Sequence, residues 1–234
     1  TTKNYNASHS DENLSSLVSN TVKTLSYSLR SFLDSNVTDR LVYDSNLGGL
    51  VTIDGLVNHE ADFGNGRYND HHFHYGYILY ACAILGKLDP SFADHYHEQV
   101  DAISYDVAHD SNFASKDADG VFFPGARHKV WFDGHSFASG LFPFGNGKSQ
   151  ESSSEAVNCY YGAYLWSLVR HGAATNPDSD TSAQTDFARL LLATEIRGAR
   201  TYWHMVPPDS SSNGKATTVY SPEFSENYMV GNLG

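Results

Sequence analysis

The sequence predicts an all-α protein in which inner and outer helices alternate, as in an α/α toroid. Apolar residues recur every three or four positions over several long segments, which indicates helices. Two segments are apolar around the whole helix, whereas the segments beside them are apolar on one side only. A helix that is apolar all round belongs in an interior. The pattern offers strands only as short candidates near residues 41–43 and 51–53.

The first two helices illustrate this contrast. Residues 11–33 are expected to form an outer helix, because a Ser, Asn and Thr face opposes an apolar face of Leu14, Val18, Val22, Leu25, Leu29 and Phe32. Residues 70–86 are expected to form an inner helix, because apolar and aromatic side chains surround it: Phe73, Tyr75, Tyr77, Ile78, Leu79, Tyr80, Ile84 and Leu85.

The alternation continues to the end of the sequence. Residues 91–109 are apolar on one side and follow Pro90, a residue favoured at helix starts. An inner helix is expected over 151–171, an outer one over 182–202, and a further helix from Ser221 towards Gly234. A closed toroid needs about twice as many helices. Residues 1–234 are therefore expected to form one partial helical domain.

Composition and charge exclude several classes of partner. Fifteen Lys and Arg residues against 27 Asp and Glu residues leave a formal charge of −12, which repels nucleic acid phosphates. No apolar run approaches the roughly 20 residues that span a bilayer. We expect a monomer without nucleic acid or membrane partners. Glycosylation triplets at Asn6, Asn13 and Asn36 favour an extracellular or cell-wall location.

Two glutamates at the start of the second inner helix are candidates for chemistry. Glu151 and Glu155 are four residues apart, so on a helix they would share a face that continues through Asn158 and Gly162 and could line a cleft. The alternative is structural. Ser152 and Glu155 match a capping box, and an acid such as Glu151 is favoured at a helix N-terminus.

The first inner helix carries a third carboxylate. Asp70 and His74 are also four residues apart, and charged groups on an apolar helix are costly without partners or a function. A helix-capping role for Asp70 is the alternative. His71, His72 and His74 suggest a metal site, but the His-x-x-x-His and His-Glu-x-x-His spacings are missing. Neither a metal nor a cofactor is therefore expected.

Four blocks resemble glycoside hydrolase family 81, the inverting endo-β-1,3-glucanases. They are LVYDSNLGGLV (41–51), DFGNGRYNDHHFHYG (62–76), WFDGHSFASG (131–140) and GKSQESSSEAVNCYY (147–161). The resemblance implies an (α/α)6 toroid, here incomplete, with Asp70 as general acid, Glu151 as general base and Glu155 as a second glutamate that matters for activity. It also implies a β-sandwich domain before the toroid and further helices after it, neither of which is visible in residues 1–234.

An inverting mechanism would use Asp70 to protonate the glycosidic oxygen and Glu151 to activate water, with the carboxyl groups about 6.5–9.5 Å apart. Glu155 would orient the water or tune Glu151. By residue type and position in the blocks, the sugar-binding walls are expected to include Tyr68, His74, Trp131, Asp133 and His135. The expected partner is β-1,3-glucan.

Two other functions stay open at this point. In the first, the chain is a non-catalytic glycan-binding module, whose aromatic residues bind sugar while its acids only cap helices. In the second, it is a metal-dependent hydrolase built on the histidine cluster, which would require three convergent ligands near residues 71–74.

Overall fold

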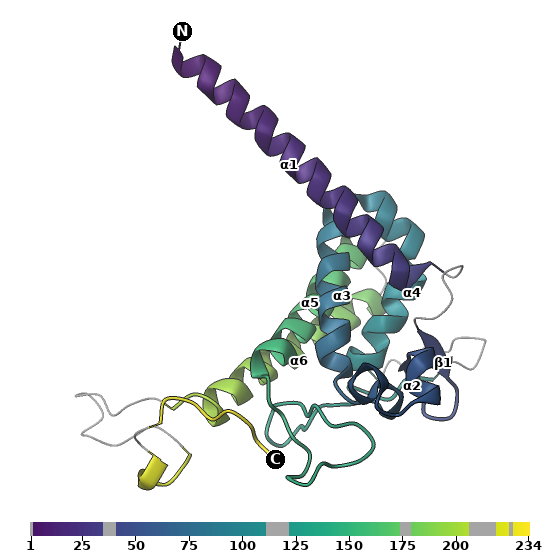
Figure 1. Ribbon diagram of the computed structural model, residues 1–234, viewed down its shortest axis with the longest axis vertical. Helices are drawn as coiled ribbons and strands as arrows, with labels where there is room; N and C mark the ends of the chain where they lie inside the picture. The colour runs from purple at the N-terminus through teal and green to yellow at the C-terminus, as the bar shows by residue number, and fades with distance from the viewer. Residues whose placement is uncertain (1, 35–40, 111–121, 174–178, 206–218, 225–226) are drawn as a thin grey trace.

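The computed structural model describes residues 2–34, 41–110, 122–173, 179–205, 219–224 and 227–234 (Figure 1). The described residues are mostly helical, which confirms the predicted all-α class. The long helices are α1 (Thr2–Leu33), α3 (His71–Leu88), α4 (Pro90–Ala108), α5 (Ser153–Ala173) and α6 (Ser179–Tyr202). The short elements are β1 (Val42–Asp44), β2 (Gly49–Val51), α2 (Ile53–Val57), η1 (Ala61–Arg67) and η3 (Pro222–Phe224).

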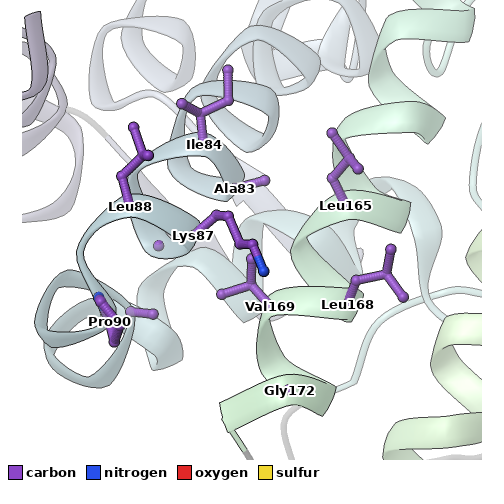
Figure 2. A pocket seen from close by; sticks show the side chains of 11 residues that line it. Ala83, Ile84, Lys87, Leu88, Pro90, Leu165, Leu168, Val169 and Gly172 are labelled. Atoms are coloured by element: carbon purple, nitrogen blue, oxygen red, sulfur yellow. The ribbon is translucent and has the colours of Figure 1, made fainter. Parts of the chain in front are cut away.

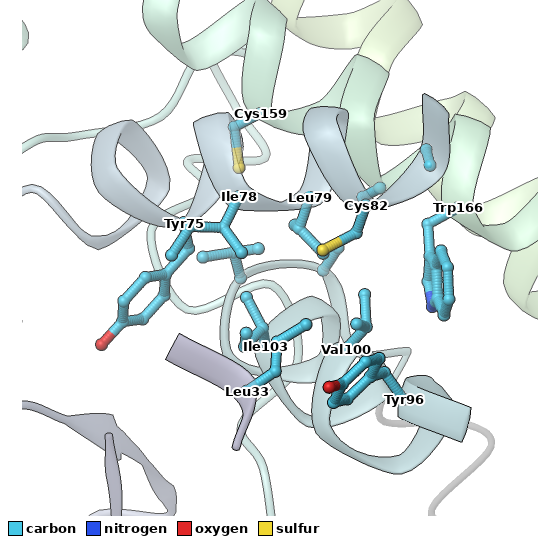
Figure 3. Close-up of a cluster of buried hydrophobic side chains, with 14 of the residues drawn as sticks. Leu33, Tyr75, Ile78, Leu79, Cys82, Tyr96, Val100, Ile103, Cys159 and Trp166 are labelled. Atoms are coloured by element: carbon cyan, nitrogen blue, oxygen red, sulfur yellow. The ribbon is translucent and has the colours of Figure 1, made fainter. Parts of the chain in front are cut away.

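The two predicted inner helices, α3 and α5, pack against each other at the centre of the molecule. Helix α4 packs on α3, α6 packs on α5, and α1 contacts α3 and α4, while its N-terminal part extends away from the bundle (Figure 1). The core between α3, α4 and α5 contains Leu79, Cys82, Ile103 and Trp166 (Figure 3). Burial on both sides explains why α3 is apolar nearly all round.

Two glycines allow α3 and α5 to approach closely. A Cβ atom on Gly76 would lie 2.8 Å from Cys159 Cα, and one on Gly162 would lie 2.8 Å from the backbone nitrogen of Tyr80. Gly162 therefore faces α3 and not the predicted cleft. Because residue 76 meets 159 and residue 80 meets 162, the two helices run parallel. Their N-termini consequently lie at the same end of the molecule.

The helix boundaries differ from the predictions at both ends of the chain. Helix α1 begins at Thr2, not near residue 11, because a polar segment without apolar periodicity can continue a helix that is already nucleated. The predicted final helix is wrong beyond η3. Residues 227–234 instead pair by isolated bridges, His204 with Met229 and Gln150 with Leu233. These tertiary hydrogen bonds replace a local helix.

The strand candidates form one antiparallel hairpin, β1–β2, in which Val42 pairs with Val51. The hairpin is fastened to the helical core through Leu50, whose N–H donates to Asp106 Oδ1 of α4 over 2.9 Å. The carbonyl oxygen of Leu50 accepts a hydrogen bond from the Tyr75 hydroxyl of α3 over 2.8 Å. The hairpin is therefore held against the first turns of α3 and the last turn of α4.

An apolar groove of about 540 Å³ runs along the C-terminal halves of α3 and α5 (Figure 2). Its lining includes Ala83, Leu88, Leu165, Leu168 and Val169. Because α3 and α5 are parallel, this groove lies at the end of the helix pair opposite to the N-termini. Within the described residues, none of the helices is both long and apolar enough to cross a membrane.

The glycosylation triplets are only partly described. Asn13 is exposed on α1, whereas Asn36 and the side chain of Asn6 lie outside the described residues.

Candidate active site

The three predicted catalytic carboxylates gather at the N-terminal ends of α3 and α5. Asp70 immediately precedes α3, Glu151 lies two residues before α5, and Glu155 is the third residue of α5. The expectation that Glu151 and Glu155 share a helix face is therefore wrong for Glu151, and Asp70 is not inside a helix. Helix α5 begins at Ser153, two residues later than predicted, so Glu151 lies in the loop before it.

The backbone of Asp70 adopts the left-handed conformation, with φ of 55° and ψ of 14°. Its N–H donates to the carbonyl oxygen of Ala138 over 2.9 Å, and its own carbonyl accepts from the N–H groups of Phe73 and His74. Asp70 thus occupies the N-cap position of α3, as the helix-capping alternative expected, but its carboxyl group makes no capping hydrogen bond. A non-glycine residue held in this conformation stores strain, a feature that clusters at functional sites.

The half-buried carboxyl group of Asp70 has a strongly perturbed acidity. Burial, reinforced by the negative charges of Glu151 and Glu155, raises its pKa from 3.8 to about 6. The neighbouring His71 acts in the opposite direction. Burial and like charges both favour the protonated form of a carboxyl group. Asp70 is therefore suited to donate a proton near neutral pH.

Glu155 connects the two inner helices. Its Oε1 accepts a hydrogen bond of 3.0 Å from the hydroxyl group of Tyr77 on α3. Its backbone N–H donates to Ser152 Oγ over 3.4 Å, which is one half of the predicted capping box. The other half is not formed, because the carboxylate turns to Tyr77. Tyr77 was not predicted, but positions 70, 74 and 77 follow the spacing of one helix face.

Glu151 is exposed, in contrast to the fully buried Gln150 before it. Exposure to solvent keeps the Glu151 carboxylate accessible to a water molecule.

Three of the predicted sugar-wall residues reach the surface. His74 is half-buried, packs edge-on against the exposed Phe63, and helps to line a depression of about 730 Å³ between α1 and α3. Trp131 is 53% exposed and lines a second depression of about 640 Å³. Asp133 is half-buried and accepts a hydrogen bond of 3.4 Å from the Tyr202 hydroxyl.

The other two predicted wall residues are buried. The ring of Tyr68 is 0% exposed, stacks on His71, and lies beneath the guanidinium group of Arg127, 4.2 Å from the ring centroid. His135 is 5% exposed and is surrounded by aromatic rings. Neither ring presents a face to solvent, so the structure places both behind the surface of the site.

The adjacent histidines diverge towards different partners. His71 Nδ1 lies 2.7 Å from Asp106 Oδ2, and its Nε2 lies 2.8 Å from the carbonyl oxygen of Asn65. His72 Nε2 lies 3.1 Å from the side-chain nitrogen of Gln150. Within the part of the chain that the structure describes, no group of three His, Cys, Asp or Glu residues could hold a metal ion. The histidines instead anchor the segment that carries Asp70.

Comparison with known proteins identifies the family of the chain. The model of the glycosyl hydrolase family 81 C-terminal domain matches residues 5–233. The primary septum glucan endo-1,3-beta-D-glucosidase of Schizosaccharomyces pombe is 37% identical over 184 residues, which are 77% of this chain and 17% of the relative. A glucan endo-1,3-beta-D-glucosidase of Arthroderma benhamiae is 39% identical over 177 residues, 75% of this chain and 18% of the relative.

A solved structure of a glycoside hydrolase family 81 protein from Clostridium thermocellum has a TM-score of 0.66 and 27% identity. The match covers 91% of this chain and 26% of that one. The chain thus spans about a quarter or less of these relatives. Since the family model covers nearly all of the sequence, the chain belongs to glycosyl hydrolase family 81 and corresponds to its C-terminal domain.

Proposed function

We propose that this chain carries the acid and the base of an endo-acting β-1,3-glucan hydrolase with an inverting mechanism. Asp70 protonates the glycosidic oxygen, Glu151 removes a proton from the attacking water, and the anomeric carbon is inverted in one displacement. Glu155, held by Tyr77, orients the water or tunes Glu151. The observation that carries the proposal is the raised pKa of Asp70, about 6, with Glu151 and Glu155 among its causes.

The division of roles follows from the surroundings of each carboxyl group. A general acid must be protonated at the working pH, which burial and two nearby negative charges favour at Asp70. A general base must reach water, and the exposed side chain of Glu151 meets that need. We propose β-1,3-glucan as the substrate because the relatives are named glucan endo-1,3-beta-D-glucosidases.

The proposed substrate also suggests where the protein acts. The name of the S. pombe relative refers to a primary septum glucan. We therefore infer that this chain acts outside the cell or at the cell wall. The toroidal closure of the helices belongs to the same proposal, because α3 and α5 run parallel as the inner helices of a toroid do.

The test is hydrolysis of laminarin by the full-length protein, with the anomer of the first product followed by NMR. The proposal expects the α-anomer from the β-linked substrate, and near-complete loss of activity in Glu151→Gln and Asp70→Asn with circular dichroism unchanged. A product of retained β-configuration would contradict the inverting mechanism. Binding of laminarin without turnover in the parent protein would favour the glycan-binding module.

A further inference from the structure

A buried polar cluster contacts Gln150, the residue before the proposed base. Lys129 Nζ donates to Glu195 Oε2 of α6 over 2.8 Å, and both charged groups are 0% exposed. The other oxygen of Glu195 accepts from the backbone N–H and the hydroxyl group of Ser136, over 3.2 and 3.1 Å. Ser136 is therefore fixed to α6 by two hydrogen bonds.

Gln150 joins this cluster to α3. Its side-chain nitrogen donates to the carbonyl oxygen of Ser136 over 2.8 Å and contacts His72 Nε2 at 3.1 Å. Its side-chain oxygen accepts from the N–H of Ser152 over 3.3 Å. The backbone of Gln150 also exchanges two hydrogen bonds with Leu233, of 2.7 and 3.1 Å. Each of these bonds constrains the loop immediately beside Glu151.

The protonation state of His72 determines which group donates and which accepts in its hydrogen bond with Gln150. His72 is fully buried, and burial together with nearby positive charges lowers its pKa to about 3. It is therefore a neutral ring at working pH, and its Nε2 can accept the amide proton of Gln150. The bond joins the residue before Glu151 to the residue two positions after Asp70.

A second link connects the same two segments through the backbone. The N–H of Asp70 donates to the carbonyl oxygen of Ala138 over 2.9 Å, and the N–H of Ala138 donates to the carbonyl oxygen of Ser149 over 2.8 Å. The acid and base segments are thus joined twice, once through buried side chains and once through the main chain. In inverting hydrolysis, the distance between the two carboxyl groups must leave room for one water molecule.

We propose that Gln150 is a positioning residue, which holds the loop that presents Glu151 at a set distance from Asp70 through its hydrogen bonds to His72 and Ser136. The proposal rests on the proposed function, because it assumes that Glu151 is the base. Gln150 touches neither substrate nor water in this role and acts only through the placement of its neighbour.

The primary variant is Gln150→Met in the full-length protein, which keeps the length of the side chain and removes its hydrogen bonds. Misplacing a catalytic group by about 1 Å can lower the reaction rate about 100-fold. We therefore expect kcat on laminarin to fall by about 10- to 100-fold, while KM changes less than about twofold. The matched control is Gln184→Met on α6, which removes a partly buried glutamine hydrogen bond of the same kind, from the side-chain nitrogen to the carbonyl oxygen of Ala108 over 2.9 Å, but none with Ser136, His72 or Ser152. The control is expected to keep its kcat.

A substrate with an activated leaving group shows which carboxylate the change disturbs. A dinitrophenyl β-laminarioligosaccharide needs no general acid, so Asp70→Asn regains turnover on it and Glu151→Gln does not. Gln150→Met is expected to behave like the base variant and to keep its defect. Turnover restored to the parental rate would assign the effect to Asp70 and overturn the proposal.

A second variant covers the case in which Gln150→Met does not fold. Gln150→Glu has the same shape but lacks the amide donors, and its carboxylate would face the carbonyl oxygen of Ser136. The proposal is supported if kcat falls to a comparable extent and the melting curve stays like that of the parent. It is overturned if either variant folds and keeps a kcat within twofold of the parent. If Glu151→Gln itself kept full activity, the proposed function would fail independently of the Gln150 result.

Discussion

Replacing the proposed acid should stabilise the protein while abolishing its activity. In the folded state the pKa of Asp70 is about 6, against an ordinary value of 3.8. Below pH 3.8 both states are protonated, so the group contributes nothing to pH dependence. Between 3.8 and 6 the unfolded state ionises first, which favours unfolding, and above pH 6 the destabilisation is complete and constant.

The magnitude follows from that difference in pKa. The gap between 6 and 3.8, at about 1.4 kcal/mol per pH unit, corresponds to about 3 kcal/mol before solvent screening is considered. Solvent screening of a half-buried group reduces this to about 1–2 kcal/mol. Asp70→Asn removes the penalty without adding backbone strain, because asparagine tolerates the left-handed conformation that Asp70 adopts.

The assay is urea unfolding of both proteins, followed by circular dichroism at about pH 7.5 and about pH 4. Asp70→Asn is expected to be more stable at the higher pH, with most of its advantage lost at the lower one. The matched control is Asp62→Asn, since Asp62 also has a positive φ, 48°, but is exposed. Equal stability of Asp70→Asn and the parent at pH 7.5, or the same gain in the control, would refute the reasoning.

Three further predictions concern the contacts around the site. Gly76→Ala should lower the free energy of unfolding in a urea titration by about 1–3 kcal/mol, because the new Cβ atom would collide with the backbone of α5. The control Gly172→Ala, which has open space around it, should be neutral or stabilising in the same titration. Lys129→Met should cost about 3–5 kcal/mol by leaving Glu195 buried without its partner, and adding Glu195→Leu should recover most of that loss in a double-mutant cycle. Tyr77→Phe should lower kcat about fivefold with an unchanged melting temperature, because the variant loses one exposed hydrogen bond to Glu155, worth about 1 kcal/mol. A kcat equal to that of the parent would show that Tyr77 is not part of the site.

Sequence periodicity was sufficient to predict the long helices and the contrast between inner and outer ones. The apolar circumference of α3 and the single apolar face of α4 reflect how many neighbours each helix has, and this information is local. The same local signal missed the first turns of α1, because a polar helix has no apolar period. It also predicted a helix near the C-terminus, where the chain instead pairs with distant residues.

The identity of the catalytic candidates came from the sequence, whereas their chemical character depended on the fold. The motifs single out Asp70, Glu151 and Glu155, but the local pattern was also compatible with structural roles: capping for Asp70 and Glu155, and a favourable position near a helix N-terminus for Glu151. Only the packing of α3 alongside α5 brings the negative charges of the two glutamates to bear on a half-buried Asp70 and raises its pKa to about 6. Acidity depends on burial and on neighbours from other elements, and spacing along the chain reports neither.

By itself, the sequence determined the helical class and the family and singled out three candidate carboxylates, because periodicity and motifs depend on residues that lie close together along the chain. The tertiary structure alone decided that Glu151 lies outside the helix and that Tyr68 and His135 are buried. It also decided that Tyr77 contacts Glu155 and that Gln150 contacts His72. These properties arise from contacts between residues about 80 positions apart, such as Gln150 with His72, which are separated by 78 positions. Local sequence patterns do not encode which distant side chain closes such a hydrogen bond.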